Sequence, residues 1–438
     1  MSTLQIVVIT ITIALNALDG FDVLSISFAS NGIAKEWGVN PGALGIVLSM
    51  ELIGMAIGSA SIGGVADKIG RRRTILGCLL LMAFGMVMAT TVHGVVDLSI
   101  WRVVTGLGIG GMLAAINAAA AEFSNTRRRH LSVSLMSIGY PLGAVFGGMV
   151  VTQLLAGHPE AWRSIFYFGA TVTALLIPIV FLFVPESVHW LARKQPVRAL
   201  EQINGALRRM GKDTVAALPE LTPEVRSKSI SDIFAPALLA TTVIVTLAYF
   251  FHITTFYFIA KWTPRIVNNL GFPASSAAGV LVWVNVGGAT GGAIFGLLTQ
   301  RYNVKSLTIG TLLASMLAVM AFGRSPADLQ TLSMIGAVAG FCTNAGIVGL
   351  YAIIAHVFPT HARAFGSGFA IGVGRGGAVI APMIAGFMFE YHYSLPVVAM
   401  TLSAGSLFGA LVLLLLKLEG EQPAARVRVS AQAVPRPV

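Results

Sequence analysis

"GGVADKIGRRRTILG" (residues 63–77) has a counterpart in the second half of the chain, "GLLTQRYNVKSLTIG" (residues 296–310). A second pair of stretches, "EFSNTRRR" (122–129) and "HVFPTHAR" (356–363), is separated by almost the same number of residues. Two independent matches at nearly one spacing indicate a duplicated unit. The sequence therefore predicts two similar halves.

The composition is that of a chain that lies in lipid. Of 438 residues, 55% are hydrophobic and 11% are charged, whereas about a quarter of the residues of a soluble protein are charged. A membrane span needs roughly 20 apolar residues. We expect twelve such spans, near residues 5–33, 42–65, 74–92, 97–121, 131–155, 163–184, 235–259, 276–299, 305–322, 327–357, 364–388 and 394–417.

One long polar stretch divides these spans six and six. We expect an N-terminal six-helix bundle (1–184), a cytoplasmic linker (185–233), a C-terminal six-helix bundle (234–418) and a disordered cytoplasmic tail (419–438). No Lys or Arg precedes the first apolar run, which argues against a cleaved signal peptide. The predicted fold class is an all-α membrane protein with two pseudo-symmetric bundles. Parallel repeats of this kind are found in many secondary transporters, which bind substrate near the midplane between the halves.

Lysines and arginines in the loops predict the orientation, because their excess marks the cytoplasmic side. Short loops on one side carry Lys68, Arg71, Arg72, Arg73, Arg127, Arg128, Arg129, Arg301, Lys305 and Arg363, and the linker and tail add more. The loops of the opposite side are expected to hold Lys35, Arg163, Lys261, Arg265 and Arg324. Both termini are therefore predicted to be cytoplasmic.

Several other classes of protein fit the sequence poorly. The net charge of +11 shows no basic face on a soluble domain, as nucleic-acid binding would need. Cys78 and Cys342 fall in separate apolar runs, so neither a disulfide framework nor a metal site is indicated. No nucleophile and base pair or cofactor loop stands out, so we expect no enzyme and no cofactor.

Four motifs carry a family resemblance. "GGVADKIGRRR" resembles the loop signature of the major facilitator superfamily, "RVVTGLGIGG" (102–111) its span 4 motif, "GYPLGAVFGG" (139–148) its span 5 motif and "PES" (185–187) the end of its span 6. "DGFD" (19–22) and "FPTHARAFGSGFAIGVGRGGAVIAP" (358–382) are similar to the aromatic acid/proton symporters within it. The resemblance implies the superfamily's fold and a proton-coupled transporter. The second-half loop departs from the signature, with Gln300 in place of Asp67 and Asn303 in place of Gly70.

Two carboxylates, Asp19 and Asp22, lie inside the first apolar run. A charge in the middle of a bilayer costs about 2.5 to 3.5 kcal/mol, so an intramembrane acid is a candidate for function. Their spacing places both on one face of a helix, where close carboxylates disfavour double ionisation. We expect the pair to load and release a proton. The alternative is that one of them only pairs with a buried arginine.

Two arginines and one further acid also lie within spans. Arg375 is surrounded by small residues and is predicted to hold a substrate carboxylate through two parallel hydrogen bonds, with a structural ion pair as the alternative. Arg102 is expected to pair with Asp22 or Asp19, in proton coupling or in plain packing. In the resembling family the arginine of this motif is implicated in coupling. Glu51 is either a further proton site or the partner of an arginine.

Other polar and aromatic residues within spans are candidates for binding substrate. His252 could hydrogen-bond a substrate or relay a proton, and a core histidine with satisfied nitrogens is the alternative. Aromatic side chains could stack on a planar ring, or only pack or anchor the helices: Phe251, Phe256, Tyr257 and Trp283. Other side chains could bind substrate hydroxyls, or only link helices: Asn117, Asn285, Asn344 and Tyr351.

The duplicated loops suggest gating residues. Asp67 with Arg71 is expected to form ion pairs that hold the halves together when the protein faces outward. Glu122 is expected to form an inner gate with Arg129 or Arg363, or to act structurally. A cluster of charges that only sets topology is the alternative for this loop.

These features together predict a monomeric transporter of the bacterial inner membrane. We expect it to import a small aromatic carboxylate, similar to benzoate or hydroxybenzoate, together with protons. An aliphatic-acid or sugar symporter, a drug or organic-cation antiporter, and a non-transporting receptor on the same fold remain alternatives. Arg375 argues against a cationic substrate.

Overall fold

Long apolar runs form helices here because a backbone in lipid must satisfy its own hydrogen bonds. The computed structural model describes residues 1–125, 128–158, 160–219, 234–359 and 363–416. Twelve helices in these ranges are long and apolar enough to cross a membrane, as predicted. The predicted tail lies outside the described residues.

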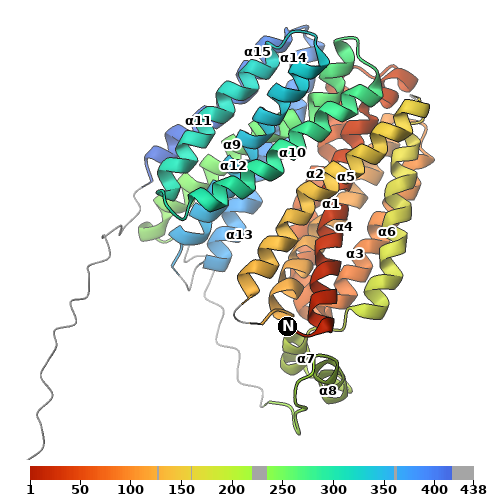
Figure 1. Ribbon diagram of the computed structural model, residues 1–438, viewed down its shortest axis with the longest axis vertical. Helices are drawn as coiled ribbons and strands as arrows, with labels where there is room; N and C mark the ends of the chain where they lie inside the picture. The colour runs from red at the N-terminus through yellow and green to blue at the C-terminus, as the bar shows by residue number, and fades with distance from the viewer. Residues whose placement is uncertain (126–127, 159, 220–233, 360–362, 417–438) are drawn as a thin grey trace, which may run out of the picture.

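The N-terminal half contains six of these helices (Figure 1). They are α1 (Thr3–Trp37), α2 (Pro41–Ile69), α3 (Arg71–Thr90), α4 (Val95–Glu122), α5 (Arg129–Gly157) and α6 (Arg163–Phe183). The linker forms two short helices, α7 (Val188–Lys194) and α8 (Ala199–Arg209). The C-terminal half contains α9 (Pro236–Asn269), α10 (Ala274–Leu298), α11 (Val304–Gly323), α12 (Leu329–Val357), α13 (Arg363–Gly374), α14 (Gly376–Glu390) and α15 (Leu395–Leu414). The eleventh predicted span is therefore divided at Arg375.

The packing repeats between the halves, as the duplication predicts. In the first half α2 packs on α4, and α3 packs on α4 and α6. The corresponding helices of the second half, α10 on α12 and α11 on α12 and α15, pack in the same way. The two largest contacts between the halves are equivalent, α2 with α14 and α5 with α10, and α1 also packs on α9.

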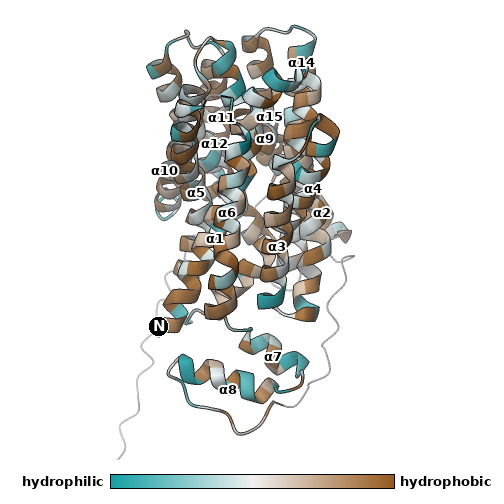
Figure 2. Cartoon of the chain, turned by 90° about the vertical axis from the view of Figure 1, so that its right-hand side faces the viewer, coloured by the Kyte–Doolittle hydropathy of each residue, from teal (hydrophilic) through white to brown (hydrophobic). Residues whose placement is uncertain are grey.

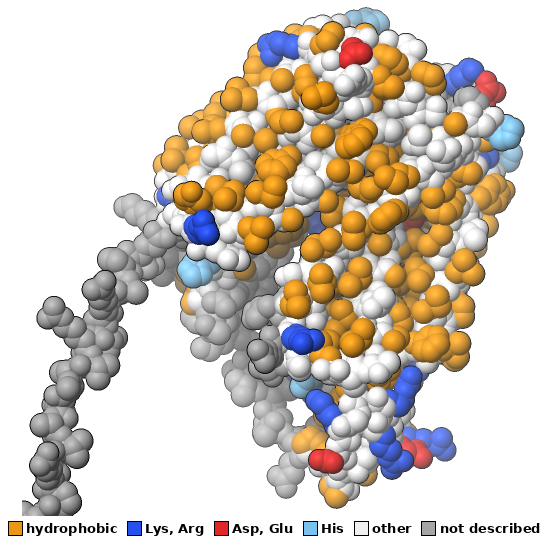
Figure 3. Space-filling view, viewed as in Figure 1, with side chains coloured by type: hydrophobic (Ala, Val, Ile, Leu, Met, Phe, Trp, Pro, Cys, Tyr) orange, Lys and Arg blue, Asp and Glu red, His pale blue; other side chains and the backbone are white. Residues whose placement is uncertain are grey.

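The two faces of the bundle differ in charge. We call the face that carries α7 and α8 the linker side, and the face that carries Trp37, Pro41 and Glu390 the far side. Hydrophilic residues are concentrated on α7 and α8, whereas the long helices are largely hydrophobic (Figure 2). Apolar side chains cover the flanks of both halves, and Lys and Arg side chains gather around the linker helices (Figure 3).

Close helix contacts depend on glycine. A Cβ atom at Gly106 of α4 would overlap the backbone carbonyl of Glu51 and would lie 3.0 Å from Gly54 of α2. Small residues allow such close approach in membrane helices. This contact brings Glu51 of α2 beside Arg102 of α4.

The far-side loops are fixed by ordinary helix signals. Gly38, with φ of 59°, ends α1, and Asn40 caps α2 by accepting a hydrogen bond from the backbone N–H of Ala43. Lys35 donates to Glu160 across the half at 2.6 Å, and the ammonium group lowers the pKa of that carboxyl. Both side chains are exposed, so this ion pair adds little stability.

The halves are held together from the far side to the middle of the membrane. Asn40 donates to Glu390 at 2.9 Å, and Ser49 donates to the carbonyl of Val379 at 2.7 Å. Between α1 and α9, Asn31 donates to the carbonyl of Pro264 at 3.1 Å. The far side is therefore closed in this structure.

Candidate functional site

The two carboxylates of α1 lie at the centre of the bundle. Asp19 and Asp22 are 2% and 0% exposed. All four of their carboxylate oxygens are buried and lack a hydrogen-bond partner among the described residues. Burying an ionised carboxylate without a partner is costly. The pair on one face of α1 was predicted, and its burial inside the bundle is confirmed.

Arg102 and Glu51 form a buried ion pair between α4 and α2, with both side chains 0% exposed. Arg102 also donates to the backbone carbonyl of Asp22 at 2.9 Å and lies over the ring of Phe166. Its charge acts on the Asp22 carboxylate, but its ion-pair partner is Glu51. The prediction that Arg102 pairs with an Asp side chain is therefore corrected, because the close α2–α4 contact brings Glu51 nearer.

The position of Lys261 differs from the one expected from the sequence. It was expected in a far-side loop, but α9 continues to Asn269 and carries both Lys261 and Arg265. The Lys261 side chain is 0% exposed, and its Nζ lies 3.6 Å from Oε2 of Glu51. The signal was present in the sequence: Lys261 stands within the largely apolar stretch "FYFIAKW" (256–262).

Arg375 lies where α13 ends and α14 begins, facing the other half. It donates to the Ser59 hydroxyl of α2 at 3.3 Å. Its guanidinium group interacts electrostatically with the side chains of Tyr249, Tyr257 and Tyr351. Tyr249 also forms a hydrogen bond with it. Asp19 of the first half also interacts electrostatically with Arg375. The predicted cation and the predicted acids therefore belong to one central cluster.

The tyrosines link this cluster to both halves. The hydroxyls of Tyr249 and Tyr351 lie 3.1 Å apart, and their rings pack at a centroid distance of 5.6 Å. Tyr257 hydrogen-bonds Tyr140 of α5. Sequence reasoning identified Tyr257 and Tyr351, but it missed Tyr140 and Tyr249, which look like ordinary aromatic residues of a membrane helix.

A small pocket in the C-terminal half contains two of the predicted asparagines. Asn285 of α10 and Asn344 of α12 line it together with Phe256 and Thr343. Asn117 of α4 donates to the carbonyl of Leu113 in its own helix, and Asn285 does the same to Leu281. Asn285 and Asn344 are therefore placed together, whereas Asn117 lies in the other half.

Three of the predicted substrate-binding residues have other contacts or are exposed in this structure. His252 is 0% exposed, with Nδ1 at 2.9 Å from Ser406 Oγ and Nε2 at 2.9 Å from the carbonyl of Thr343. It is the core histidine of the alternative, since both ring nitrogens are used within its own half. Trp283 is 53% exposed. Phe251 packs on Phe408 of α15, with ring centroids 5.7 Å apart.

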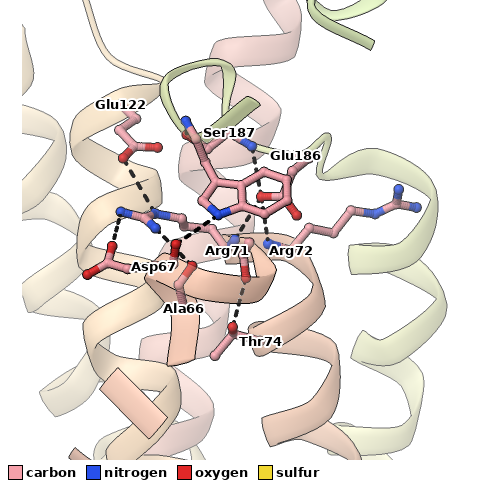
Figure 4. Close-up of polar contacts among 10 residues, drawn as sticks. Ala66, Asp67, Arg71, Arg72, Thr74, Glu122, Glu186 and Ser187 are labelled. Carbon is pink, nitrogen blue, oxygen red and sulfur yellow. Dashed lines mark hydrogen bonds and ion pairs between the residues drawn. The ribbon is translucent and has the colours of Figure 1, made fainter. Parts of the chain in front are cut away.

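The loop between α2 and α3 forms a charged junction (Figure 4). Arg71 pairs with Asp67 at 2.8 Å and lies 3.6 Å from Glu122 of α4. Glu122 therefore pairs with Arg71 in its own half, rather than with the predicted Arg129, which is exposed. The side chain of Arg363 lies outside the described residues.

Glu186, the middle residue of the "PES" stretch, is a part of this junction that sequence reasoning did not identify. Its Oε1 accepts hydrogen bonds from the backbone N–H groups of Arg71 at 2.7 Å and Ser187 at 2.9 Å. Gly70 has φ of 106°, and a Cβ there would meet the Glu186 carboxylate. Trp190 of α7 donates to the carbonyl of Asp67 at 3.1 Å. The linker is thereby joined to the loop.

The corresponding loop of the second half is built differently. Asn303 stands in place of Gly70 and caps α11 with its own side chain, which accepts from the backbone N–H of Ser306 at 3.1 Å. In the first half, an external carboxylate, Glu186, performs this task at the start of α3. The two loops, which differ in sequence at these positions, thus also differ in how their helices begin.

Two six-helix halves with buried charges between them are the architecture of a membrane transporter, not of an enzyme. A profile described as Major Facilitator Superfamily matches residues 10–322 and 245–437. The chain belongs to this superfamily.

Curated relatives and solved structures agree with this assignment. The chain is 27% identical over 400 residues to a gallate transporter of Pseudomonas putida, covering 90% of this chain and 88% of the relative. It is 28% identical to the 4-hydroxybenzoate transporter PcaK of Pseudomonas putida, covering 83% and 81% of the two chains. The inward open conformation of the xylose transporter XylE from E. coli matches with a TM-score of 0.72 at 18% identity, covering 95% and 98%. The resemblance to aromatic acid transporters seen in the sequence is confirmed by these relatives.

Proposed function

We propose that this protein carries a small aromatic carboxylate across the membrane together with protons, by alternating access. One observation carries the proposal: the Arg375 guanidinium, surrounded by tyrosine hydroxyls, interacts across the interface between the halves with Asp19. The names of the relatives support the substrate class. We further propose that the protein acts as a monomer, that protons are its coupling ion, and that the linker side faces the cytoplasm of a bacterial inner membrane.

The geometry gives a physical reason for coupling. A buried arginine needs an anionic partner, because desolvating an unpaired charge is expensive. With Asp19 ionised, Arg375 has that partner within the protein. When Asp19 is protonated, Arg375 loses it, and a substrate carboxylate can take its place with two parallel hydrogen bonds. Proton and substrate therefore enter the site together.

The tyrosines favour a small aromatic acid in this site. Tyr249 and Tyr351 offer hydroxyls for ring substituents of the substrate, and Tyr257 adds a ring that can pack on it. Asn285 and Asn344 line a pocket nearby on α10 and α12, where they can accept or donate further hydrogen bonds. A planar carboxylate with hydroxyl groups satisfies this set of partners.

The test is uptake of radiolabelled 4-hydroxybenzoate into proteoliposomes with an imposed pH gradient, alkaline inside. We expect accumulation that a protonophore abolishes. Asp19→Asn should lose accumulation and keep exchange of labelled for unlabelled substrate, because exchange needs no net proton movement. Accumulation that survives both the protonophore and Asp19→Asn contradicts the coupling mechanism.

The substrate class is tested in the same vesicles by competition. Unlabelled benzoate and gallate should inhibit uptake, whereas xylose, succinate and a cationic dye should not. Inhibition by the dye alone would instead point to an organic-cation transporter.

A further inference from the structure

Three charged residues from three helices meet between the middle of the bundle and its far side. Glu51 of α2 forms an ion pair with Arg102 of its own half, and Lys261 Nζ of the other half lies 3.6 Å from its second oxygen. All three side chains are 0% exposed. Glu51 is ten residues into α2, about 15 Å from the far-side end at 1.5 Å per residue. The carboxylate of Glu51 thus interacts with one cation from each half.

Both cations also bind the same place on α1. Arg102 donates to the carbonyl of Asp22 at 2.9 Å, and Lys261 donates to the carbonyl of Val23, the next residue. Lys261 therefore contacts two helices of the opposite half, α1 through Val23 and α2 through Glu51. The charged groups that act on Lys261 are Glu51, which stabilises its charge, and Arg102, which opposes it.

These contacts cannot survive opening of the far side. Separation of α9 from α1 and α2 would move the ammonium group away from Glu51 and from Val23. The cost of leaving a buried charge without partners would then oppose opening until water reaches Lys261. Arg102 and Glu51 also act electrostatically on the acids of α1, whereas the contacts of Lys261 are with Glu51 and Val23. We therefore assign the effect on conformation to Lys261.

We propose that Lys261 is a latch: by binding Glu51 and Val23 of the N-terminal half, it holds the far side closed. Lys261 is thus a positioning residue of the transport cycle. The importance of the latch for transport rests on the proposed function, but its effect on conformation does not.

The latch is tested by pulsed electron paramagnetic resonance on purified protein without substrate. Spin labels are attached at His93→Cys and Arg324→Cys, which are exposed far-side positions of the two halves, after Cys78→Ala and Cys342→Ala. The labelled protein that retains Lys261 and Glu51 should give mainly short distances between the two spin labels. Lys261→Met should raise the population with long distances about tenfold or more. A contact that stabilises only one of two conformations shifts the equilibrium between them by the free energy that it contributes, and this variant removes that contact. Lys261→Arg should keep the short distances.

Two further variants complete the experiment. Arg265→Met removes a cation one turn along α9 and should leave the distances unchanged. Glu51→Gln should shift them in the same direction as Lys261→Met, which covers the case that Lys261→Met does not fold. Distances unchanged in both Lys261→Met and Glu51→Gln, or an equal shift in Arg265→Met, overturn the latch. Lack of aromatic acid uptake by the unaltered protein would instead overturn the proposed function and leave the latch standing.

Discussion

Arg375 of the C-terminal half donates a hydrogen bond to Ser59 of the N-terminal half at 3.3 Å, so the guanidinium group spans the interface at the level of the central acids. The backbone at Arg375 is helical, and its N–H donates to the carbonyl of Ile371 at 3.0 Å, so the side chain reaches the interface from one face of the eleventh span. The proposed anion site is therefore made by both halves.

Replacing Arg375 tests the anion site directly. Arg375→Lys keeps the charge but loses the second parallel hydrogen bond to a carboxylate. Hydrogen bonds to charged groups contribute about 1.5 to 3 kcal/mol, so we expect the Kd for 4-hydroxybenzoate to rise about 10- to 100-fold. Isothermal titration calorimetry measures this change. Arg324→Lys, at an exposed position, is the control, and equal losses in both variants would argue against the site.

The aromatic assignments give a paired prediction. Tyr351→Phe removes one hydroxyl of the Tyr249–Tyr351 pair, and at about 1 kcal/mol per hydrogen bond it should raise KM for uptake roughly fivefold. Trp283→Phe should leave KM unchanged, because the Trp283 side chain is 53% exposed. A large KM effect at Trp283 with none at Tyr351 would reverse the assignment that the structure makes.

The junction at Arg71 should govern the rate of transport and not the affinity for substrate. Glu122→Gln removes the charge that Arg71 faces at 3.6 Å on α4. A loss of about 1 kcal/mol in one conformation would change the maximal uptake rate about fivefold, with KM nearly constant. Initial-rate measurements separate the two quantities. Glu201→Gln, whose pairing with Arg198 is exposed, should change neither.

The close contact between α2 and α4 predicts a stability effect. Gly106→Ala forces a methyl group into the backbone of Glu51, and overpacking costs about 1 to 3 kcal/mol. We expect a lower Tm in detergent, monitored by tryptophan fluorescence. Gly77→Ala is the matched control: a Cβ there meets no atom within 4 Å, so the change should be neutral or slightly stabilising. Equal Tm values for the two variants would contradict the packing described here.

Much of the architecture could be predicted from the sequence because the membrane constrains it strongly. Each span must be apolar over its whole length, so runs of residues mark the helices, and the duplicated loops after spans 2 and 8 reveal the two halves. The acids of α1 stood out for the same reason, since Asp19 and Asp22 interrupt an apolar run where charge is expensive. Arg375 stood out in the same way on the eleventh span.

The partners of these residues could not be predicted. Arg102 was matched with an Asp of α1, but the glycine contact between α2 and α4 gives it Glu51. His252 is a plausible substrate ligand by residue type, but Ser406 and Thr343 occupy both of its nitrogens. Such pairings join residues that are far apart in the chain, and the periodic pattern of apolar residues does not indicate which of them meet.

The sequence by itself determined that this chain crosses the membrane twelve times in two related halves, and that it places ionisable groups inside them. Local composition is sufficient for this, because lipid accepts only apolar, internally hydrogen-bonded segments. Only the tertiary structure decided that Lys261 is a buried residue that reaches Glu51 and Val23 of the opposite half. That placement depends on how far α9 extends and on how closely the halves pack, which are properties of the assembled bundle and of no single segment.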